Sequence, residues 1–532
     1  MGLLALALAS AQLLPFVDLS LHSNRGSGFG NSAWSMPAHG WANFLAPLFR
    51  TSPWQQIVVQ KNQYWTSSYY AGIGAVFLAG MALWRQRGWR VWLPGLLLLT
   101  SLVLALGDHG YLLPLLQRLL PFVGLFRYPV KFVLLTLFVI PLLAAVAIGH
   151  YQHWKPASSR AWWPEFLGGA AILMAIGGIL WFARLSPAGD VGWRQTAVNG
   201  AERAAILAVF IAGIFGLVAR PEWRTVTGAA LVGLCWLDVL THMPWQNPTV
   251  DASVYARGLA LRDAAFPPQS VAAGGSRVMI SPYAARRIYY LSNPDAQEAF
   301  LLDRLVFEAN CNLLDDVPKV DGFFSLYLRD IDKVLSLFDT NAESHLGQLE
   351  DVMAVSQTIA PGKIFDWVRR PSFLPWVSAG QAPVFAGEAE TLRALADPDS
   401  NFHQSVYLPQ EARSVITARR EPAARVVTKK FGANNTVLEV ETPSAALVFV
   451  SQAWYHNWRA RVDGRPTMLW RANQAFQAVE APAGRHEIEL TYEDTAFRCG
   501  LAASILSLVL CATVWPWLAP LHRREAHATF PK

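Results

Sequence analysis

The chain has 532 residues, of which 53% are hydrophobic and only 15% are charged, whereas typical soluble proteins carry roughly 25% charged residues. The net charge of +6 is mild, and no dense basic stripe accompanies it, which argues against a nucleic-acid partner. The four cysteines show neither a disulfide framework nor metal-ligand spacing, so we expect no metal and no cofactor.

Eight apolar stretches predict helices that cross a membrane, because a spanning helix needs about 20 mostly apolar residues. The first, 1–17, could be a signal peptide with a cleavage site at Ala9-Ser10-Ala11, but no positive residues precede it. We therefore prefer the end of a spanning helix. The seven later stretches are Tyr69–Trp84, Val91–Leu106, Val130–Gly149, Leu167–Ala183, Ala204–Ala219, Val226–Leu240 and Gly500–Ala519.

The loops between these stretches predict which side of the membrane each one faces. Short loops dense in arginine, such as Arg85–Arg90, alternate with longer loops such as Asp18–Ser68 in which basic residues are sparse. The positive-inside rule places the short loops in the cytoplasm. The polar block from about His242 to Arg498 is then extracytoplasmic.

The predicted fold class is a polytopic α-helical membrane protein of about eight spans, with a large extracytoplasmic α/β region that ends in an antiparallel β-sandwich. Period-two alternation begins after Arg425 and includes an Asp463-Gly464 hairpin turn, which predicts the sandwich. The expected domains are a seven-span transmembrane domain at 1–245, a mixed α/β domain at 246–424, the β-sandwich at 425–497, and the final span with a cytoplasmic tail at 498–532.

Two cations in the loop Leu106–Lys131 are candidates for binding a phosphate. Arg127 and Lys131 are four residues apart at the outer mouth of the next span, so both can face one anionic group. Arginine suits phosphate through its planar, bidentate guanidinium, and a lipid phosphate is the natural ligand at that depth. The alternative is that both side chains snorkel to ordinary headgroups or anchor the helix end.

Three residues are candidates for catalysis. Asp108 and His109 open the same loop, and a carboxylate there could act as general base for a glycosyl acceptor; alternatively Asp108 caps the next helix or turn. Asp18 lies at the outer end of the first span and shares a helix face with His22 by its spacing of four. Asp238 has the same spacing from His242 at the outer end of the seventh span. A charge inside the membrane is functional by default, but Asp238 lies near enough to the edge to be a solvated cap.

Aromatic residues of the sandwich are candidates for glycan binding. Trp454, Tyr455 and Trp458, with Trp470, could form a platform on which sugar rings stack, although at strand spacing some of them must fill the core. The sequence contains no P-loop, GxGxxG, GxSxG or HExxH motif. The sequence therefore gives no support for a P-loop nucleotide-binding protein, a dinucleotide-binding enzyme, an α/β-hydrolase or a zinc protease of the HExxH type.

Three stretches resemble the bacterial YfhO family of polytopic membrane proteins. They are Gln12–Pro15 with Ser23-Asn24-Arg25, the LGD…LFRYPVKF loop at Leu106–Phe132, and WYHNWRARVDG with AVEAPAGRHEIELTYE at Trp454–Gly464 and Ala478–Glu493. The family is similar to GT-C glycosyltransferases. This resemblance implies a bacterial cytoplasmic-membrane enzyme that transfers a sugar from a polyprenyl-phosphate donor to an envelope polysaccharide or teichoic-acid-like acceptor, and it adds Arg25 to the lipid-phosphate candidates.

GT-C enzymes normally carry their catalytic acidic residues in the first outer loop, and that loop has no counterpart here. We therefore expect the chain to correspond to the C-terminal portion of the family pattern. The alternative function is a non-catalytic envelope protein that binds or scaffolds glycans through its sandwich. A transporter ranks last, because the predicted spans contain almost no ionisable residues.

Overall fold

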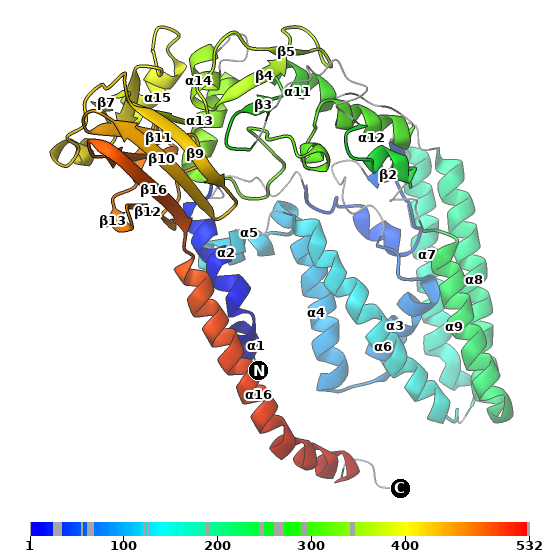
Figure 1. Cartoon of the computed structure of the whole chain (residues 1–532). Helices are drawn as coiled ribbons and strands as arrows, with labels where there is room; N and C mark the ends of the chain where they lie inside the picture. The colour runs from blue at the N-terminus through cyan, green and yellow to red at the C-terminus, as the bar shows by residue number, and fades with distance from the viewer. Residues whose placement is uncertain are drawn as a thin grey trace. The chain divides into compact units, whose positions relative to one another are not determined.

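The computed structural model describes residues 2–24, 34–54, 57–60, 69–120, 123–124, 128–156, 158–187, 192–243, 249–259, 271, 273–289, 291, 293, 295–340 and 346–528. The chain divides into two compact units (Figure 1). The first unit comprises Met1–Gly26, Asp251–Ser292 and Gln297–Lys532, and the second comprises Ser27–Val250 with Asn293–Ala296. The domain boundaries drawn from the sequence stay predictions.

The second unit is a helical bundle. In chain order, its described elements are η2 (Gly40–Phe44), β1 (Thr51–Trp54), β2 (Ile57–Gln60), α3 (Ile73–Arg85), α4 (Trp89–Ala105), η3 (Gly107–Gly110), α5 (Leu112–Leu119), η5 (Pro129–Phe132), α6 (Val133–His153), η6 (Ser159–Trp162), α7 (Trp163–Leu185), α8 (Trp193–Ala219), η7 (Pro221–Trp223) and α9 (Arg224–Leu240).

Helix α3 is the centre of this bundle, because it contacts α4, α6, α7, α8 and α9. Phe77, Leu78 and Met81 are among its buried residues. With 13 residues it is about 20 Å long, shorter than the roughly 30 Å hydrocarbon layer of a bilayer. Seven of its 13 residues are buried, so the surrounding helices cover most of its surface.

Five described helices are long and apolar enough to cross a membrane, which identifies a candidate membrane protein. A sixth span results if α1 (Gly2–Leu8) and α2 (Ser10–His22), bent by 80°, count as one. This is fewer than the eight expected, because α3 and α4 are short and the first stretch is broken. The five segments are Pro129–His153, Arg160–Leu185, Trp193–Ala219, Pro221–Leu240 and Thr495–Val514.

In the first unit, α1 and α2 pack along α16 (Thr495–Ala528). The bend between α1 and α2 frees backbone groups from their helical partners, and Ser504 of α16 bonds to them. Its hydroxyl accepts a hydrogen bond from Ala11 N at 3.0 Å and donates to Ala7 O at 3.3 Å. Breaks in membrane helices are tolerated when a neighbouring side chain bonds to the freed backbone in this way.

Gly500 lets α16 approach α2 closely. A β-carbon at this position would collide with the backbone oxygen of Ser10 and would lie 3.0 Å from Ala11 Cα. Because backbone atoms cannot swing aside as a flexible side chain can, the helices would have to separate.

We expect Gly500→Ala to destabilise the first unit by about 1–3 kcal/mol, the usual cost of overpacking, although alanine is the better helix former. Thermal unfolding of the detergent-solubilised chain measures the effect. The matched control is Gly177→Ala in α7, where a β-carbon meets nothing within 4 Å. Equal stability of the two variants would contradict close α2–α16 packing.

The region before the sandwich mixes short helices and strands around two hydrophobic clusters, one of which also includes residues of the sandwich. Strand β3 pairs in parallel with β4, β4 pairs antiparallel with β5, and β7 pairs in parallel with β8. The elements are η8 (Ala252–Tyr255), β3 (Arg277–Met279), α11 (Pro282–Tyr289), α12 (Ala296–Leu305), η9 (Cys311–Asp315), α13 (Arg329–Thr340), α14 (Gly347–Val352), β4 (Val355–Ile359), β5 (Trp367–Arg369), β6 (Val377–Ala379), β7 (Ala382–Phe385), α15 (Glu388–Ala396), β8 (Ser405–Leu408) and η10 (Gln410–Ser414).

Two sheets pack face to face to form the C-terminal β-rich region. One has the strand order β13-β12-β16-β10-β9 and the other β14-β15-β11-β6, so β6 joins from the preceding region. The predicted hairpin at Asp463-Gly464 is confirmed: both residues have positive φ, and Val462 pairs with Arg465. The strands are β9 (Arg425–Phe431), β10 (Asn435–Thr442), β11 (Ala446–Val450), β12 (Trp458–Val462), β13 (Arg465–Thr467), β14 (Trp470–Ala472), β15 (Phe476–Ala481) and β16 (Gly484–Tyr492).

Alternating residues of the strands form the core between these sheets. Leu438 and Val440 of β10, with Ile488 and Leu490 of β16, are buried against Val448 and its neighbours from the other sheet. The residues between them, such as Glu439 and Glu489, are only partly buried. This arrangement confirms the period-two pattern read from the sequence.

Candidate functional site

The carboxylate of Asp18 lies where the end of α2 meets the β-sandwich. Tyr455 donates a hydrogen bond from its hydroxyl to Asp18 Oδ2 at 2.5 Å, and His456 Nε2 lies 3.3 Å from the same oxygen. His22 Nδ1 lies 3.6 Å from Oδ1. Residues 437 positions apart in the sequence are thus in direct contact.

The end of α2 and the loop that carries Tyr455 and His456 are each held in place by their own hydrogen bonds. The end of α2 is tied to α13 and the residues before it: Asn24 donates to Tyr327 O and to Asp332 Oδ1, each at 2.9 Å, and Arg329 donates to Leu21 O at 2.8 Å. These bonds fix the direction in which the last turn of α2 presents Asp18 and His22.

The loop that carries Tyr455 and His456 runs from β11 to β12. Trp454 N donates to Ala475 O at 2.7 Å, and Asn457 O accepts from Glu493 N at 2.9 Å. The Tyr455 ring stacks on Tyr492, with ring centroids 6.4 Å apart. The loop is therefore held against β16 and the segment before β15 by groups other than Asp18.

The site is negative apart from its histidines. Among the described residues, the ion pairs of Asp18 involve only histidines. Burial raises the pKa of the Tyr455 hydroxyl far above its ordinary value, and its hydrogen bond to Asp18 and the charges of Asp18 and Asp494 raise it further. The phenol consequently stays protonated and keeps donating to Asp18.

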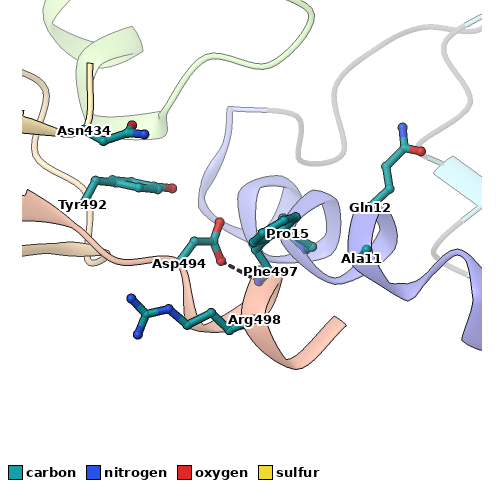
Figure 2. A pocket seen from close by; sticks show the side chains of 8 residues that line it. All are labelled: Ala11, Gln12, Pro15, Asn434, Tyr492, Asp494, Phe497 and Arg498. Atoms are coloured by element: carbon teal, nitrogen blue, oxygen red, sulfur yellow. Dashed lines mark hydrogen bonds between the residues drawn. The ribbon is translucent and has the colours of Figure 1, made fainter. Parts of the chain in front are cut away.

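A pocket of about 770 Å³ shares elements with the cluster, and Figure 2 shows the side chains that line it. Ala11 and Pro15 line it from α2, and Asp18 follows them on the same helix face, because the positions are three to four residues apart. Tyr492 lines the pocket and stacks on Tyr455. The pocket and the Asp18 cluster are therefore adjacent. The remaining lining residues are Gln12, Asn434, Asp494, Phe497 and Arg498.

The lining of this pocket combines apolar surface with one charge of each sign. Pro15, Phe497 and Ala11 are apolar, and Asp494 is acidic. The largely exposed guanidinium of Arg498 lies 4.0 Å from Glu493. Asp494 caps the start of α16 by accepting from Phe497 N at 2.7 Å (Figure 2). A ligand with an apolar chain and an anionic head matches such a lining.

The other predicted catalytic and phosphate-binding residues lie elsewhere. Asp108 and His109 are exposed in η3 of the second unit. Lys131 is exposed in η5, and its ammonium is 4.6 Å from the centroid of the Tyr128 ring. Arg25 and Arg127 lie outside the described residues.

The predicted glycan-binding aromatics are partly covered by their own domain. Tyr455 is only 8% exposed and bonds to Asp18. Trp458 packs against the sandwich core, and its ring meets Tyr492 edge to face at 5.6 Å. Trp454 is half-buried. Their use as a sugar platform stays a prediction.

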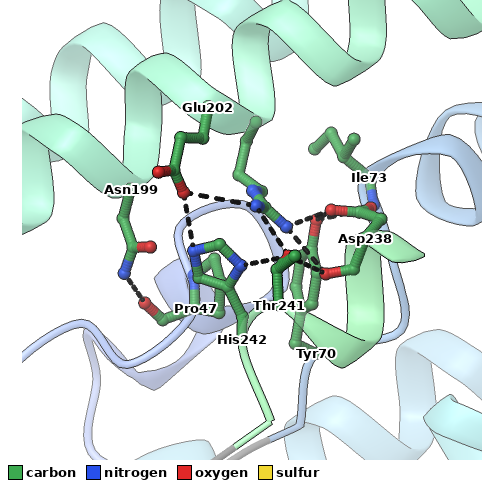
Figure 3. Close-up of polar contacts among 9 residues, drawn as sticks. Pro47, Tyr70, Ile73, Asn199, Glu202, Asp238, Thr241 and His242 are labelled. Carbon is green, nitrogen blue, oxygen red and sulfur yellow. Dashed lines mark hydrogen bonds and ion pairs between the residues drawn. The ribbon is translucent and has the colours of Figure 1, made fainter. Parts of the chain in front are cut away.

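A second polar cluster is buried in the helical unit (Figure 3). Arg203 of α8 pairs with Asp238 of α9, and both side chains are 1% exposed. Asp238 also accepts from Tyr70 Oη at 2.9 Å and from Ile73 N, the first residue of α3, at 2.7 Å. The expectation of a solvated cap at Asp238 is wrong, because α3 and α8 enclose it.

The neighbouring histidine belongs to the same network. His242 Nε2 lies 3.1 Å from Glu202 Oε2, and its Nδ1 lies 2.9 Å from the hydroxyl of Thr241 (Figure 3). Each charge in this group therefore has a partner, as buried charges require.

The opposite end of α3 is held in a similar way. Arg85, its last residue, pairs with Glu165 of α7 at 2.6 Å, and Tyr151 of α6 donates to the same carboxylate at 2.7 Å. The short central helix is thus fixed at both ends by ion pairs with its neighbours. We interpret the two networks as structural.

Sequence reasoning missed Arg203 and Glu165 because the predicted spans begin at 204 and 167, just after them. The sequence did contain a signal, because one charged residue stands at the edge of each of these two spans. Pairing Arg203 with Asp238, and Glu165 with Arg85, would have revealed both contacts.

We expect Asp238→Ala or Arg203→Ala to destabilise the protein by about 3–5 kcal/mol, because each leaves an unpaired buried charge. The double variant Arg203→Met with Asp238→Leu removes both charges and should cost less than the sum of the two single changes. Thermal unfolding in detergent tests this. Additive losses would contradict a direct, buried pair.

Comparisons of the chain with protein-family models, with curated protein sequences and with solved structures find no match in any of the three. The resemblance to the YfhO family therefore stays a prediction. We infer the function from the geometry of the Asp18 cluster and its pocket.

Proposed function

We propose that the protein is a membrane-bound glycosyltransferase of the GT-C type, or its C-terminal part. It would transfer a sugar from a polyprenyl-phosphate donor to an envelope polysaccharide or teichoic-acid-like acceptor. The proposed place is the outer face of a bacterial cytoplasmic membrane, with about eight spans and an extracytoplasmic polar block. The observation that carries the proposal is the carboxylate of Asp18, held at the end of an apolar helix beside a pocket suited to an anionic lipid.

The chemistry requires a base and a neutralised leaving group. In the proposed reaction, an acceptor hydroxyl attacks the anomeric carbon of the donor, its proton passes to Asp18, and the bond from that carbon to the phosphate oxygen breaks. Because Tyr455 donates to Oδ2, Oδ1 is the oxygen better placed to take the proton. The polyprenyl phosphate leaves as an anion.

The pocket supports binding of the donor lipid. Its wall formed by Ala11, Pro15 and Phe497 suits an isoprenoid chain, and Arg498 can pair with a phosphate. We retain the sequence prediction that Arg127, Lys131 and Arg25 also bind lipid phosphate. At such a site, cations stabilise the charge that develops on the leaving group.

Asp18→Asn should lower sugar transfer by about 10²–10⁴-fold, the usual contribution of a general base. The readout is mass spectrometry of envelope polymers from a deletion strain that carries each variant. Asp399→Asn, an exposed carboxylate of the polar block, is the matched control and should retain transfer. Gel filtration shows whether both variants fold.

Two results would count against this proposal. Undiminished transfer by a folded Asp18→Asn protein removes the base from the mechanism. Unchanged envelope glycans in the deletion strain itself would favour the non-catalytic scaffold instead.

Arg127→Ala together with Lys131→Ala should reduce transfer while the protein remains inserted and folded, because the phosphate loses its counter-charges. The control pair is Lys155→Ala with Arg160→Ala, in a loop predicted to be cytoplasmic. Transfer by each variant is compared at equal membrane abundance. Equal rates for the two pairs would refute the phosphate assignment.

A further inference from the structure

We propose that Asp18, His22 and His456 form a binding site for one divalent transition-metal ion, and that Zn²⁺ fits it best. Each residue offers one ligand atom, and the three atoms lie within 4.8 Å of one another. The sequence predicted no metal, because the residues come from opposite ends of the chain. Binding of the ion does not depend on glycosyl transfer.

The donor set determines the class of metal. Two imidazole nitrogens and one carboxylate oxygen suit Zn²⁺ and its neighbours in the first transition series, whereas Ca²⁺ and Mg²⁺ prefer oxygen ligands only. At zinc–ligand bonds of about 2.0–2.2 Å, two ligand atoms of a tetrahedral site lie roughly 3.4 Å apart. The three ligand atoms lie within 4.8 Å of one another, so the side chains must move closer by about 1 Å to reach this separation.

The surrounding hydrogen bonds orient the ligands as metal sites require. Tyr455 donates to Asp18 Oδ2, which leaves Oδ1 free to bind an ion. His22 Nδ1 lies 2.8 Å from the carbonyl oxygen of Asp18, and because a carbonyl cannot donate, this nitrogen carries the proton. The lone pair of His22 is therefore on Nε2, and such a bond from the other ring nitrogen is common in metal-binding histidines.

The third ligand, His456, differs from His22 in its hydrogen bonding. Its Nδ1 is buried and has no hydrogen-bond partner among the described residues. No hydrogen bond among the described residues thus fixes the tautomer of this ring, so Nε2 can carry the lone pair that a metal ion requires. The His22 and His456 rings lie 4.4 Å apart between centroids, close enough to bind the same ion.

The electrostatic environment also favours a cation. Asp18 has only histidines as ion-pair partners among the described residues, and Asp494 adds a second carboxylate charge near Tyr455. The three side chains are partly exposed, at 22%, 48% and 37% for Asp18, His22 and His456. With three protein ligands, a tetrahedral ion would keep one position open, as catalytic zinc sites do.

The role of the ion, unlike its binding, rests on the proposed function. A hydroxyl bound at the open position would become more acidic, because the metal withdraws electron density from its oxygen. With the ion bound, Oδ1 of Asp18 is a ligand and not the base, so the proton of the acceptor hydroxyl passes to solvent water. An ion at this site would also join α2 to the sandwich.

The test uses the full chain, purified in detergent with a tag that contains no histidine and stripped with EDTA. Titration with ZnCl₂ by calorimetry should show one ion per chain with a dissociation constant of about 10 µM or tighter, and thermal unfolding should shift upward by several degrees, since binding stabilises the folded state. Absence of saturable one-to-one binding of Zn²⁺ to the folded wild-type chain would overturn the proposal.

Variants distinguish this site from other histidines. His22→Asn and His456→Gln should each weaken Zn²⁺ binding by about 100-fold or more, and Tyr455→Phe by about 10–100-fold, the effect of losing an outer-shell partner. The control, His403→Gln, alters a half-exposed histidine paired with Asp351 and should bind as the wild type does. Equal affinity in all four variants would refute the assignment.

A spectroscopic variant covers the case in which a histidine change impairs folding. His456→Cys keeps a ligand at the position, so bound Co²⁺ should acquire a sulfur-to-cobalt charge-transfer band in the near ultraviolet. A folded His456→Cys chain that binds Co²⁺ without this band would exclude residue 456 as a ligand. If Zn²⁺ binds as proposed while Asp18→Asn leaves transfer intact, the metal site survives and the proposed function fails.

Discussion

The contact between Asp18 and the Tyr455-His456 pair joins the first helices of the described chain to its last domain. Because one carboxylate accepts from Tyr455 and faces two imidazoles, it fixes the end of α2 against the sandwich. The pocket beside it is built from the same pieces, α2, β16 and the start of α16. Loss of this contact would separate the members of the cluster, whereas the pocket keeps the packing of α2 against α16.

Both units contain buried ion pairs that hold neighbouring elements together. In the first unit, Arg304 and Asp315 form an ion pair in which neither side chain is exposed, and Arg370 pairs with Glu350 and Asp351. Removing a charge from water is costly unless a partner compensates, so these pairs specify which elements can pack together. In the helical unit, the same requirement places α3 between α7 and α9.

Local patterns predicted the elements well. The apolar stretches at all eight positions are helical in the described residues, and the alternation around Leu438 and Ile488 identifies the sandwich strands. Lengths were less accurate: the stretch predicted from Tyr69 becomes helical only at Ile73, whose backbone N–H bonds to Asp238, an interaction that apolarity alone does not reveal. Strand β6 was missed as a sandwich member, because only three residues of it pair with β11.

The candidate site was only partly predictable. The spacing of four between Asp18 and His22 placed them on one helix face, but no local pattern relates them to His456. Tyr455 was predicted from its aromatic ring, whereas in the structure its hydroxyl is the group that bonds to Asp18. Contacts between segments so far apart in sequence depend on the fold and not on any window of residues.

The pairing of α2 with α16 has a consequence for biosynthesis. Ala11 and Ser504 are 493 residues apart, and at roughly 5–20 residues per second the ribosome needs about 25–100 s to make the chain between them. During that interval the backbone groups at the α1–α2 bend lack the hydroxyl that bonds to them in the finished protein. An insertase or chaperone able to shelter polar backbone within the bilayer would shorten the time for which this bend is exposed to lipid.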